Sequence, residues 1–220
     1  MEGNIIRTEA GSQTRRRVRN SAVAKAKILK AAEDEFANNG LSGARIDTIA
    51  LASGYNKSLI YQYFGNKEKL YEVVIYNTYS KLSEVEQVII SKELGYEESV
   101  AMIVQCYFEF LKDNPNFVKL IMHENLNQGK YIAASGSLRV KDPMLQALKK
   151  VVEAGKSEGV FNESVDETQV LISLITGSFS YFSNIYTLSQ VLHIDLSEEE
   201  NRKKRMKFVT ESILNYLRNG

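Results

Sequence analysis

The chain has 220 residues, of which 44% are apolar, 25% are charged and two are proline, a composition that excludes a disordered or collagen-like protein. Its single cysteine, Cys106, excludes an intramolecular disulfide, and no cluster of cysteines and histidines suggests a metal site, so neither a metal nor a cofactor is expected. The formal net charge is +1, but residues 1–70 hold 12 basic and 7 acidic residues, whereas residues 71–220 hold 16 and 20. A basic module followed by a mildly acidic one is typical of a protein that approaches a phosphate backbone with its first part only.

No segment of the sequence is suited to export or to a membrane. The arginines near the N-terminus, Arg7 and those between Arg15 and Arg19, are not followed by the apolar run of a secretory signal. The most apolar later stretch, Leu171–Phe182, is interrupted by serine, threonine and glycine, and it is shorter than the roughly 20 residues that a membrane helix needs. We therefore expect a cytoplasmic protein with no membrane partner.

Apolar residues recur at helical spacing along nearly the whole chain, and no segment alternates like a strand, so we expect an all-α fold. The first helix is expected from about Ala22 to Asn39, with Gly40 as its terminator, followed by short helices at Ile46–Ala52 and Lys57–Phe64. A much longer helix is expected from Asn66, its cap, to about Ile89. Further helices are expected at about Glu97–Lys112, Asn116–Asn125, Lys141–Ser157, Asp166–Leu192 and Ser197–Arg218, and residues 128–139 are ambiguous.

This order of elements divides the chain into three parts. Residues 1–20 are expected to form a basic flexible arm, residues 21–66 a compact three-helix module, and residues 67–220 a larger helical domain. The second boundary lies where short helices give way to long ones. The arm can be interpreted as a solvated tail or as a tail that touches nucleic acid, and both interpretations stay open.

Residues 46–63 have the spacing of a helix-turn-helix. Ala50 lies where the two helices cross closely, and Gly54, four residues later, permits the positive φ of a tight turn. Ile60 follows six residues after Gly54 and is expected to pack the pair against Phe36 of the first helix. The other face of the second helix then stays free to meet phosphates and base edges in the major groove of DNA.

The motif is accompanied by Gly40-Leu41, Ile49-Ala50, Gly54-Tyr55-Asn56-Lys57 and, above all, Ile60-Tyr61-Gln62-Tyr63-Phe64-Gly65-Asn66-Lys67-Glu68-Lys69-Leu70. In these residues the stretch from about Lys27 to Leu70 resembles the DNA-binding domain of the TetR family of bacterial repressors. The resemblance implies that the helix at 57–64 is the recognition helix and that Tyr61 and Lys67 hold backbone phosphates. Ala44 departs from the family, in which a threonine or serine often touches phosphate there, and the neighbouring Arg45 is expected to supply a contact instead.

The residues expected to contact DNA are Arg45, Lys57, Ser58, Leu59, Tyr61, Gln62, Tyr63 and Lys67. Leu59 is a candidate for an apolar contact with a thymine methyl group. Core packing is the alternative for Tyr61 and Tyr63, and simple solvation is the alternative for the two lysines. The pattern does not predict which base sequence is bound.

The resemblance further implies that residues 67–220 bind a small-molecule effector and form a homodimer. The last two expected helices are similar in position to the pair that forms a four-helix dimer interface in the family, and both carry apolar stripes. The residues expected at this interface are Leu171, Leu174, Ile175, Ser178, Phe179, Phe182, Phe208, Ile213, Leu214 and Leu217. A two-fold dimer would present two recognition helices about one DNA turn apart, which predicts a palindromic operator.

Aromatic residues are plentiful in the second part, and some could line an effector pocket rather than the core. A mainly apolar pocket with a few polar groups is expected from Tyr107, Met122, His123, Tyr181 and Asn184, with core packing as the alternative for each. The run from His123 to Asn127 begins like the zinc hydrolase pattern His-Glu-x-x-His. Because Asn127 stands at the second ligand position, that interpretation is rejected.

The sequence therefore predicts a ligand-responsive transcriptional regulator without enzymatic activity: a repressor that binds double-stranded operator DNA as a homodimer and is released by an unknown small molecule. Activation of transcription is the alternative to repression, because the effect of a bound regulator depends on where its operator lies relative to the promoter. The alternatives are a helical small-molecule-binding or interaction protein without sequence-specific DNA binding, or an enzyme that uses the aromatic cavity. No glycine-rich phosphate loop, nucleophile elbow or paired histidines favour the enzyme.

Overall fold

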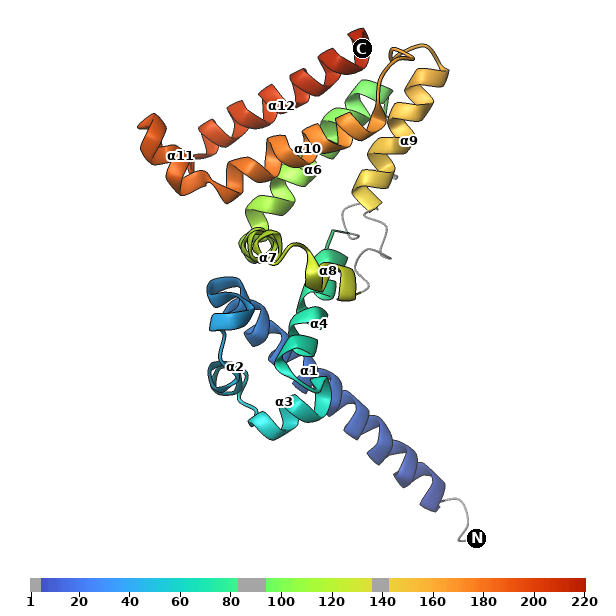
Figure 1. Ribbon diagram of the computed structural model, residues 1–220. Coiled ribbons are helices and arrows are strands. Elements are labelled where there is room, and N and C mark those ends of the chain that lie inside the picture. Colours follow the sequence, from blue (N-terminus) through green and yellow to red (C-terminus); the bar gives the residue numbers. More distant parts are fainter. Residues whose placement is uncertain (1–4, 83–93, 136–142) are drawn as a thin grey trace. The chain divides into compact units, whose positions relative to one another are not determined.

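The protein consists of helices and connecting loops. The computed structural model describes the backbone of residues 5–82, 94–135 and 143–220, and every regular element in these ranges is a helix (Figure 1). The all-α prediction is thereby confirmed. The chain forms two compact units, the first ending at Val74 and the second running from Ile75 to Gly220. The predicted boundary at residue 66 lies immediately before α4 (Lys67–Ser80), a helix that begins in the first unit and ends in the second.

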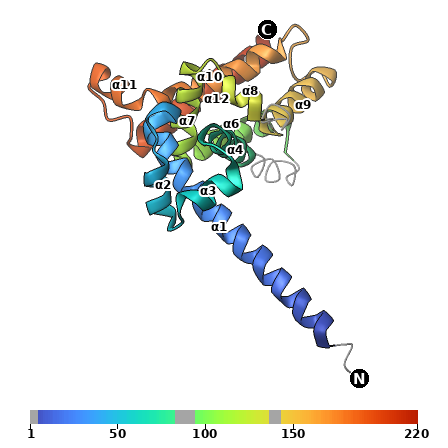
Figure 2. The ribbon, with the colours of Figure 1, turned by 60° about the horizontal axis from the view of Figure 1, so that its bottom comes forward.

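The first unit contains α1 (Ile5–Gly43), α2 (Ile46–Ser53), α3 (Lys57–Phe64) and the beginning of α4 (Figure 2). α1 begins at Ile5 rather than near Ala22, so the segment predicted as a flexible arm is helical from Ile5 onward. Arginine is a good helix former and no proline occurs in this segment, so the helix continues through it. Gly40 has φ 64° and ψ 179°, and α1 therefore kinks at the residue where the sequence predicts its end.

The core of the first unit joins α1 to α4. Phe36 is fully buried, and its ring meets the ring of Tyr71 edge-on, with centroids 5.0 Å apart and an interplanar angle of 79°. Ile28 and Ala32 extend the same buried face of α1. Because α1 and α4 are both anchored through this core, they form the scaffold that carries the two short helices.

The second unit is a helical bundle in which α6 is the central element. Its helices are α6 (Tyr96–Asp113), α7 (Pro115–Leu126), α8 (Lys130–Ser135), α9 (Pro143–Ser157), α10 (Glu167–Ser183), α11 (Ile185–Leu192) and α12 (Glu199–Asn219). α6 packs against α9, α10 and α12, and α10 runs alongside α12 (Figure 1). Their shared core includes Val100, Ile103, Val104, Phe108, Leu148, Leu174, Val209 and Leu217.

Beyond α1, the helices differ from the sequence predictions at three further places. The helix expected to reach Ile89 ends as α4 at Ser80, and residues 83–93 lie outside the described residues. The ambiguous stretch contains α8, whereas residues 136–142, including the expected helix start at Lys141, are also outside. The single helix expected over 166–192 is divided at Asn184 into α10 and α11. Asn184 has φ −111° and ψ 13°, which departs from helical geometry, and its side-chain Nδ2 donates to the main-chain oxygen of Ser180 at 3.0 Å.

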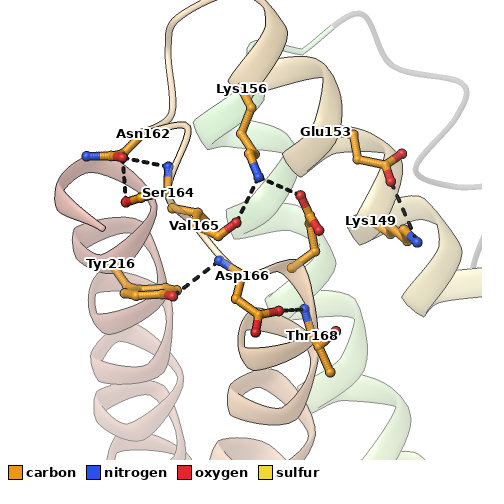
Figure 3. A network of polar contacts seen from close by, with 10 residues as sticks. Lys149, Glu153, Lys156, Asn162, Ser164, Val165, Asp166, Thr168 and Tyr216 are labelled. Atoms are coloured by element: carbon orange, nitrogen blue, oxygen red, sulfur yellow. Dashed lines mark hydrogen bonds and ion pairs between the residues drawn. The ribbon is translucent and has the colours of Figure 1, made fainter.

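A polar network fixes the connection between α9, α10 and α12 (Figure 3). Lys156 of α9 donates from Nζ to the main-chain oxygen of Val165 at 2.8 Å and to Oε1 of Glu167 at 2.7 Å. The hydroxyl of Tyr216 on α12 accepts from the main-chain N–H of Asp166 at 3.3 Å, and Oδ1 of Asp166 caps α10 by accepting from Thr168 at 2.8 Å. The start of α10 is therefore held against both neighbouring helices.

Candidate nucleic-acid interface

The turn between α2 and α3 has the geometry that the motif predicts. Gly54 has φ 76° and ψ 19°, and its N–H donates to the main-chain oxygen of Ala50 at 3.0 Å, which closes the C-terminus of α2. Asn56 then caps α3, because its Oδ1 accepts from the main-chain N–H of Leu59 at 2.8 Å. The two short helices are thus set at a defined angle by local hydrogen bonds.

Packing leaves most of α3 uncovered. Ile60 is 1% exposed and is the one residue of this eight-residue helix that is buried, and Ile49 of α2 is fully buried as well. Every other side chain of α3 is exposed or half-buried. A short helix that is attached through a single buried residue presents the rest of its surface outward, as a recognition helix must.

The eight residues predicted to contact DNA lie on the outward surface of α3 or next to it. Arg45, Lys57, Ser58, Tyr61 and Gln62 are exposed, and Leu59, Tyr63 and Lys67 are half-buried. Arg45 precedes α2, where its main-chain N–H donates to Oε1 of Glu35 on α1 at 2.9 Å. The position of Arg45 is therefore fixed through its backbone, while its side chain stays at the surface. Contact of these residues with DNA remains a prediction.

Two of the predicted lysines have partners within the first unit. Nζ of Lys57 lies 2.5 Å from Oδ1 of Asp47 on α2. Nζ of Lys67 donates to the main-chain oxygen of Ala44 at 3.1 Å and to that of Ser42 at 3.4 Å. Lys67 is therefore bound to the carbonyl groups that follow the kink of α1, a role that the resemblance to the family does not suggest.

Lys25 and Asp47 belong to this surface although the sequence analysis did not select them. Nζ of Lys25 lies 5.2 Å from the centroid of the Tyr63 ring, a cation–π contact between α1 and α3. Lys25 lies 38 positions before Tyr63, and Asp47 lies 10 before Lys57. The helical spacing of a sequence does not predict such pairs, because they form between different helices only after the chain has folded.

The residues predicted for the effector pocket are placed in different surroundings. Tyr107 is buried on α6, whereas Met122 is exposed and His123 half-buried on α7. The hydroxyl of Tyr181 donates to the main-chain oxygen of Leu196 at 2.6 Å, and burial raises the pKa of this hydroxyl. Tyr181 and Asn184 therefore have structural partners at the end of α10, and their effector contact remains a prediction.

A buried carboxylate on α7 is a further candidate for effector contact, and the sequence analysis did not select it. Glu124 is 1% exposed, and its Oε2 accepts from the main-chain N–H groups of Tyr131 and Ile132 at 3.1 and 2.9 Å. Its Oε1 is also buried and has no hydrogen-bond partner among the described residues. A buried carboxylate oxygen without a donor is unfavourable, so this atom is suited to accept from a bound molecule. In the sequence Glu124 resembles any glutamate of a surface helix.

The predicted dimer residues are divided between the core and the surface of the second unit. Leu174, Ser178, Ile213 and Leu217 are buried within the unit. Leu171, Ile175, Phe179, Phe182 and Leu214 are half-buried, and Phe208 is 60% exposed. The first four belong to the core of the unit within one copy, and a place for them at a dimer interface remains a prediction. Phe208 alone of the ten residues lies fully on the outer face.

The outer face of α10 and α12 contains a groove with a volume of about 240 Å³. The groove is lined by Val170, Ser173, Thr176, Gly177, Arg205, Phe208, Val209, Ser212, Ile213 and Tyr216. Gly177 brings α10 close to α12, since a Cβ atom there would lie 3.2 Å from Cγ2 of Val209. Nε of Arg205 donates to the main-chain oxygen of Gly177 at 3.1 Å, and its guanidinium lies 5.4 Å from the ring centroid of Phe208. Several of the groove residues are therefore small, and two of them, Phe208 and Tyr216, are aromatic.

A helix-turn-helix with an uncovered second helix, followed by a larger all-helical unit, defines a DNA-binding transcriptional regulator. Residues 28–74 match the family described as bacterial regulatory proteins, tetR family, and residues 97–213 match the tetracyclin repressor-like C-terminal domain. The chain belongs to the TetR family of transcriptional regulators. Among the described helices, none has the length and apolar character needed to cross a bilayer.

One relative of known name is similar over most of the chain and another over about a quarter of it. The HTH-type transcriptional repressor NicS of Pseudomonas putida is 30% identical over 192 residues, which cover 87% of this chain and 91% of NicS. The repressor SCO4008 of Streptomyces coelicolor is 49% identical over 57 residues, or 26% of this chain and 30% of that protein. The structure of FadR from Bacillus subtilis in complex with stearoyl-CoA has 20% identity and a TM-score of 0.65, and the match covers 89% of this chain and 98% of FadR. This last likeness shows a shared fold.

Proposed function

We propose that the protein is a transcriptional repressor that binds a near-palindromic operator as a homodimer and releases it when a small molecule binds. The observation that carries the proposal is the outward surface of α3, a helix in which Ile60 is the one buried residue. Repression rather than activation is favoured because NicS and SCO4008 are both named as repressors. Because the family consists of bacterial regulatory proteins and bacterial DNA lies in the cytoplasm, we propose that the protein acts there.

Selection from random duplexes tests the DNA-binding part of the proposal. We expect the retained fragments to share a two-fold site whose half-sites are centred about one helical turn, roughly 34–36 Å, apart. A variant with Lys57, Tyr61 and Gln62 all changed to alanine should keep its helical circular dichroism, because these residues are exposed, and should lose the enrichment. Enrichment of sites without two-fold symmetry would contradict the dimeric mode of binding.

We propose that the dimer forms through the groove between α10 and α12. Ser173, Thr176 and Ser212 are small residues that permit close approach of a second helix pair, and Phe208 is the apolar side chain that can fill the matching groove of a second copy. In a two-fold contact the same patch faces itself, so each copy would supply one Phe208 and one groove. Ile172, also exposed on α10, adds apolar surface beside the groove.

α11 supplies further apolar surface at the end of the α10–α12 pair (Figure 1). None of its eight residues is buried, and Tyr186, Val191 and Leu192 are exposed. An eight-residue helix is too short to be stable without packing, and residues 184–194 include no aspartate, glutamate, lysine or arginine that would repel an identical surface. We therefore expect α11 to pack against the second copy as well.

For the effector, we propose an organic molecule that binds within the second unit and donates a hydrogen bond to Oε1 of Glu124. The FadR structure was obtained with stearoyl-CoA, which shows that this fold accommodates an organic ligand in one relative, although its chemistry is not carried over. α4 is continuous from Lys67 to Ser80, so a change in the second unit is passed to α3 through a helix rather than through a loop. Binding of effector would favour a spacing of the two α3 helices that no longer fits the operator.

Operator release tests the effector part. Sequencing the genomic fragments that the protein retains identifies the genes next to its binding sites. The substrates and products of the enzymes that those genes encode are then added to the protein–operator complex. An effector that releases wild-type protein should release the Glu124→Gln variant only at higher concentration. The amide keeps the size of the side chain, but with its oxygen on the N–H groups of Tyr131 and Ile132 it places an NH2 group, which cannot accept a hydrogen bond, where Oε1 stood. Equal sensitivity of both proteins would exclude Glu124 from the effector site.

A further inference from the structure

Lys25 belongs to α1, but the end of its side chain lies beside α3. Its Nζ is 5.2 Å from the centroid of the Tyr63 ring, and the residue is exposed. Ala24 and Ile28 are buried on α1, and Lys25 lies one turn before Ile28, at the margin of the buried face. The packing of α1 therefore brings a cation from a distant part of the sequence to the edge of the candidate nucleic-acid interface.

No carboxylate among the described residues forms an ion pair with Lys25, whose contact is with the Tyr63 ring. Other lysines of the first unit are paired with acidic side chains: Lys30 with Asp34 at 2.9 Å, and Lys69 with Glu72 at 2.8 Å. An aromatic ring attracts a cation through its electron-rich face but does not cancel the charge. Lys25 therefore presents a full positive charge at the surface.

The Tyr63 ring also restricts where the ammonium can be. A free lysine side chain has many rotamers, and ordering it in a complex costs conformational entropy, part of which the ring contact has already removed. An ammonium has three N–H donors and the ring covers one side of it, so a phosphate oxygen can be bound while the cation–π contact is kept. Lys25 thus needs no exchange of partners, unlike Lys57, which is paired with Asp47.

We propose that Lys25 binds a phosphate of the DNA backbone next to α3 and that Tyr63 is the residue that positions it. A phosphate contact carries no base information, so Lys25 strengthens binding to every DNA sequence alike. The inference rests on the proposed DNA contact of α3, and the two are tested separately: the triple alanine variant of α3 reports on that helix, whereas variants of Lys25 leave α3 unchanged.

The Lys25→Met variant tests the phosphate contact, with Lys27→Met as its matched control. Lys27 is also exposed on α1 and carries the same charge, but its side chain points about 200° around the helix from that of Lys25. Binding to a random-sequence duplex and to the selected operator is measured by fluorescence anisotropy between about 50 and about 200 mM salt. Circular dichroism checks that both variants keep their helices.

We expect Lys25→Met to make the slope of log K against log salt shallower by about one for each copy bound. The advantage of the wild type over the variant should therefore shrink about threefold per copy between about 50 and about 200 mM salt. Both DNAs should be weakened by the same factor, and Lys27→Met should keep the wild-type slope.

Three results would overturn the phosphate contact of Lys25: no loss of affinity, a loss confined to the operator, or an equal change of slope in Lys27→Met. The second of these would make Lys25 a reader of bases. Absence of DNA binding by the wild type would overturn this contact together with the proposed function, whereas binding that is insensitive to Lys25→Met would overturn this contact alone.

Variants of Tyr63 test the positioning role. Tyr63→Phe keeps an aromatic ring, so in this background Lys25→Met should weaken binding as much as in the wild type. Tyr63→Leu removes the ring but keeps an apolar side chain, and there the effect of Lys25→Met on log K should fall to about half or less. An equal effect of Lys25→Met in all three backgrounds would refute the positioning of Lys25 by Tyr63.

Discussion

Lys67, the first residue of α4, donates from Nζ to the main-chain oxygen of Ala44, 3.1 Å away, and so ties α4 to the chain just after α1. The same ammonium reaches the oxygen of Ser42 at 3.4 Å. These carbonyls follow the kink at Gly40 and precede α2. Lys67 therefore holds the segment from which the helix-turn-helix begins, and this role can coexist with the phosphate contact that the sequence predicts.

The two roles of Lys67 can be separated by Lys67→Met. Loss of the hydrogen bonds to Ala44 and Ser42 should lower the free energy of unfolding by about 1 kcal/mol. If Lys67 also binds phosphate, the slope of log K against log salt should become shallower by about one for each copy bound. Thermal unfolding and anisotropy titrations measure the two effects. A loss of stability with an unchanged salt slope would leave Lys67 a positioning residue only.

Tyr61 and Gln62 are neighbours on α3 for which we predict different effects on DNA recognition. If Tyr61 binds phosphate as the sequence predicts, Tyr61→Phe removes one hydrogen bond and should weaken binding to every DNA sequence by about fivefold per half-site, equivalent to about 1 kcal/mol. Gln62→Ala removes a base-reading group and should relax the preference at one position of the half-site. Selection and titration with both variants make the comparison. Both side chains are exposed, so neither change should alter the unfolding temperature.

Phe208 is expected to be the main contact of the dimer. Phe208→Ala should raise the dimer Kd about 30-fold, because two-fold symmetry removes two copies of a contact worth about 1 kcal/mol each. Sedimentation equilibrium measures this change. Leu126→Ala is the control, since Leu126 is an exposed apolar residue on α7, away from the groove. A Kd that responds equally to both variants would indicate a different interface.

The network at the start of α10 should make stability depend on pH through Glu167 (Figure 3). The hydrogen bond from Lys156 lowers the pKa of Glu167, so ionised Glu167 stabilises the folded state above the ordinary glutamate pKa of about 4.3, and this contribution is lost as the pH falls through the lower folded-state pKa. Lys156→Met should lower Tm by about 2 °C at pH 7.

At pH 3 the difference in Tm between wild type and Lys156→Met should narrow, because the stabilising ionisation is then being lost in the wild type. Lys207→Met serves as the control, since Lys207 pairs with Glu211 on α12 at the longer distance of 3.7 Å and is not among the groups that lower the pKa of Glu167. A difference in Tm that is constant from pH 7 to pH 3 would assign the whole effect to the bond between Lys156 and Val165.

The recognition motif could be predicted from the sequence because its determinants are local. Gly54 at positive φ, Asn56 as a cap and Ile60 as the buried anchor lie within seven residues, and each acts on its immediate neighbours. The helical period likewise predicted the short helices α2 and α3. Contacts across the turn, such as Asp47 with Lys57, depend on the angle between two helices and have no counterpart in the spacing.

The dimer surface shows where helical periodicity is insufficient. An apolar stripe indicates that one face of a helix is covered, but it does not tell whether the cover is the same chain or a second copy. Leu174 and Ile213 are buried in the core of their own unit, whereas Phe208 is 60% exposed. Glu124 was missed for a related reason, since its burial depends on the turn that leads into α8.

The length of α1 restricts how the arginine-rich segment from Arg15 to Arg19 can meet DNA. This segment is helical in the structure, and an α-helix with its side chains is about 10–12 Å wide. The minor groove of B-form DNA is about 6 Å wide, whereas the major groove is about 12 Å wide. While it keeps this conformation, the segment fits a major groove or the outside of the sugar–phosphate backbone, and entry into a minor groove would first require these turns to unwind.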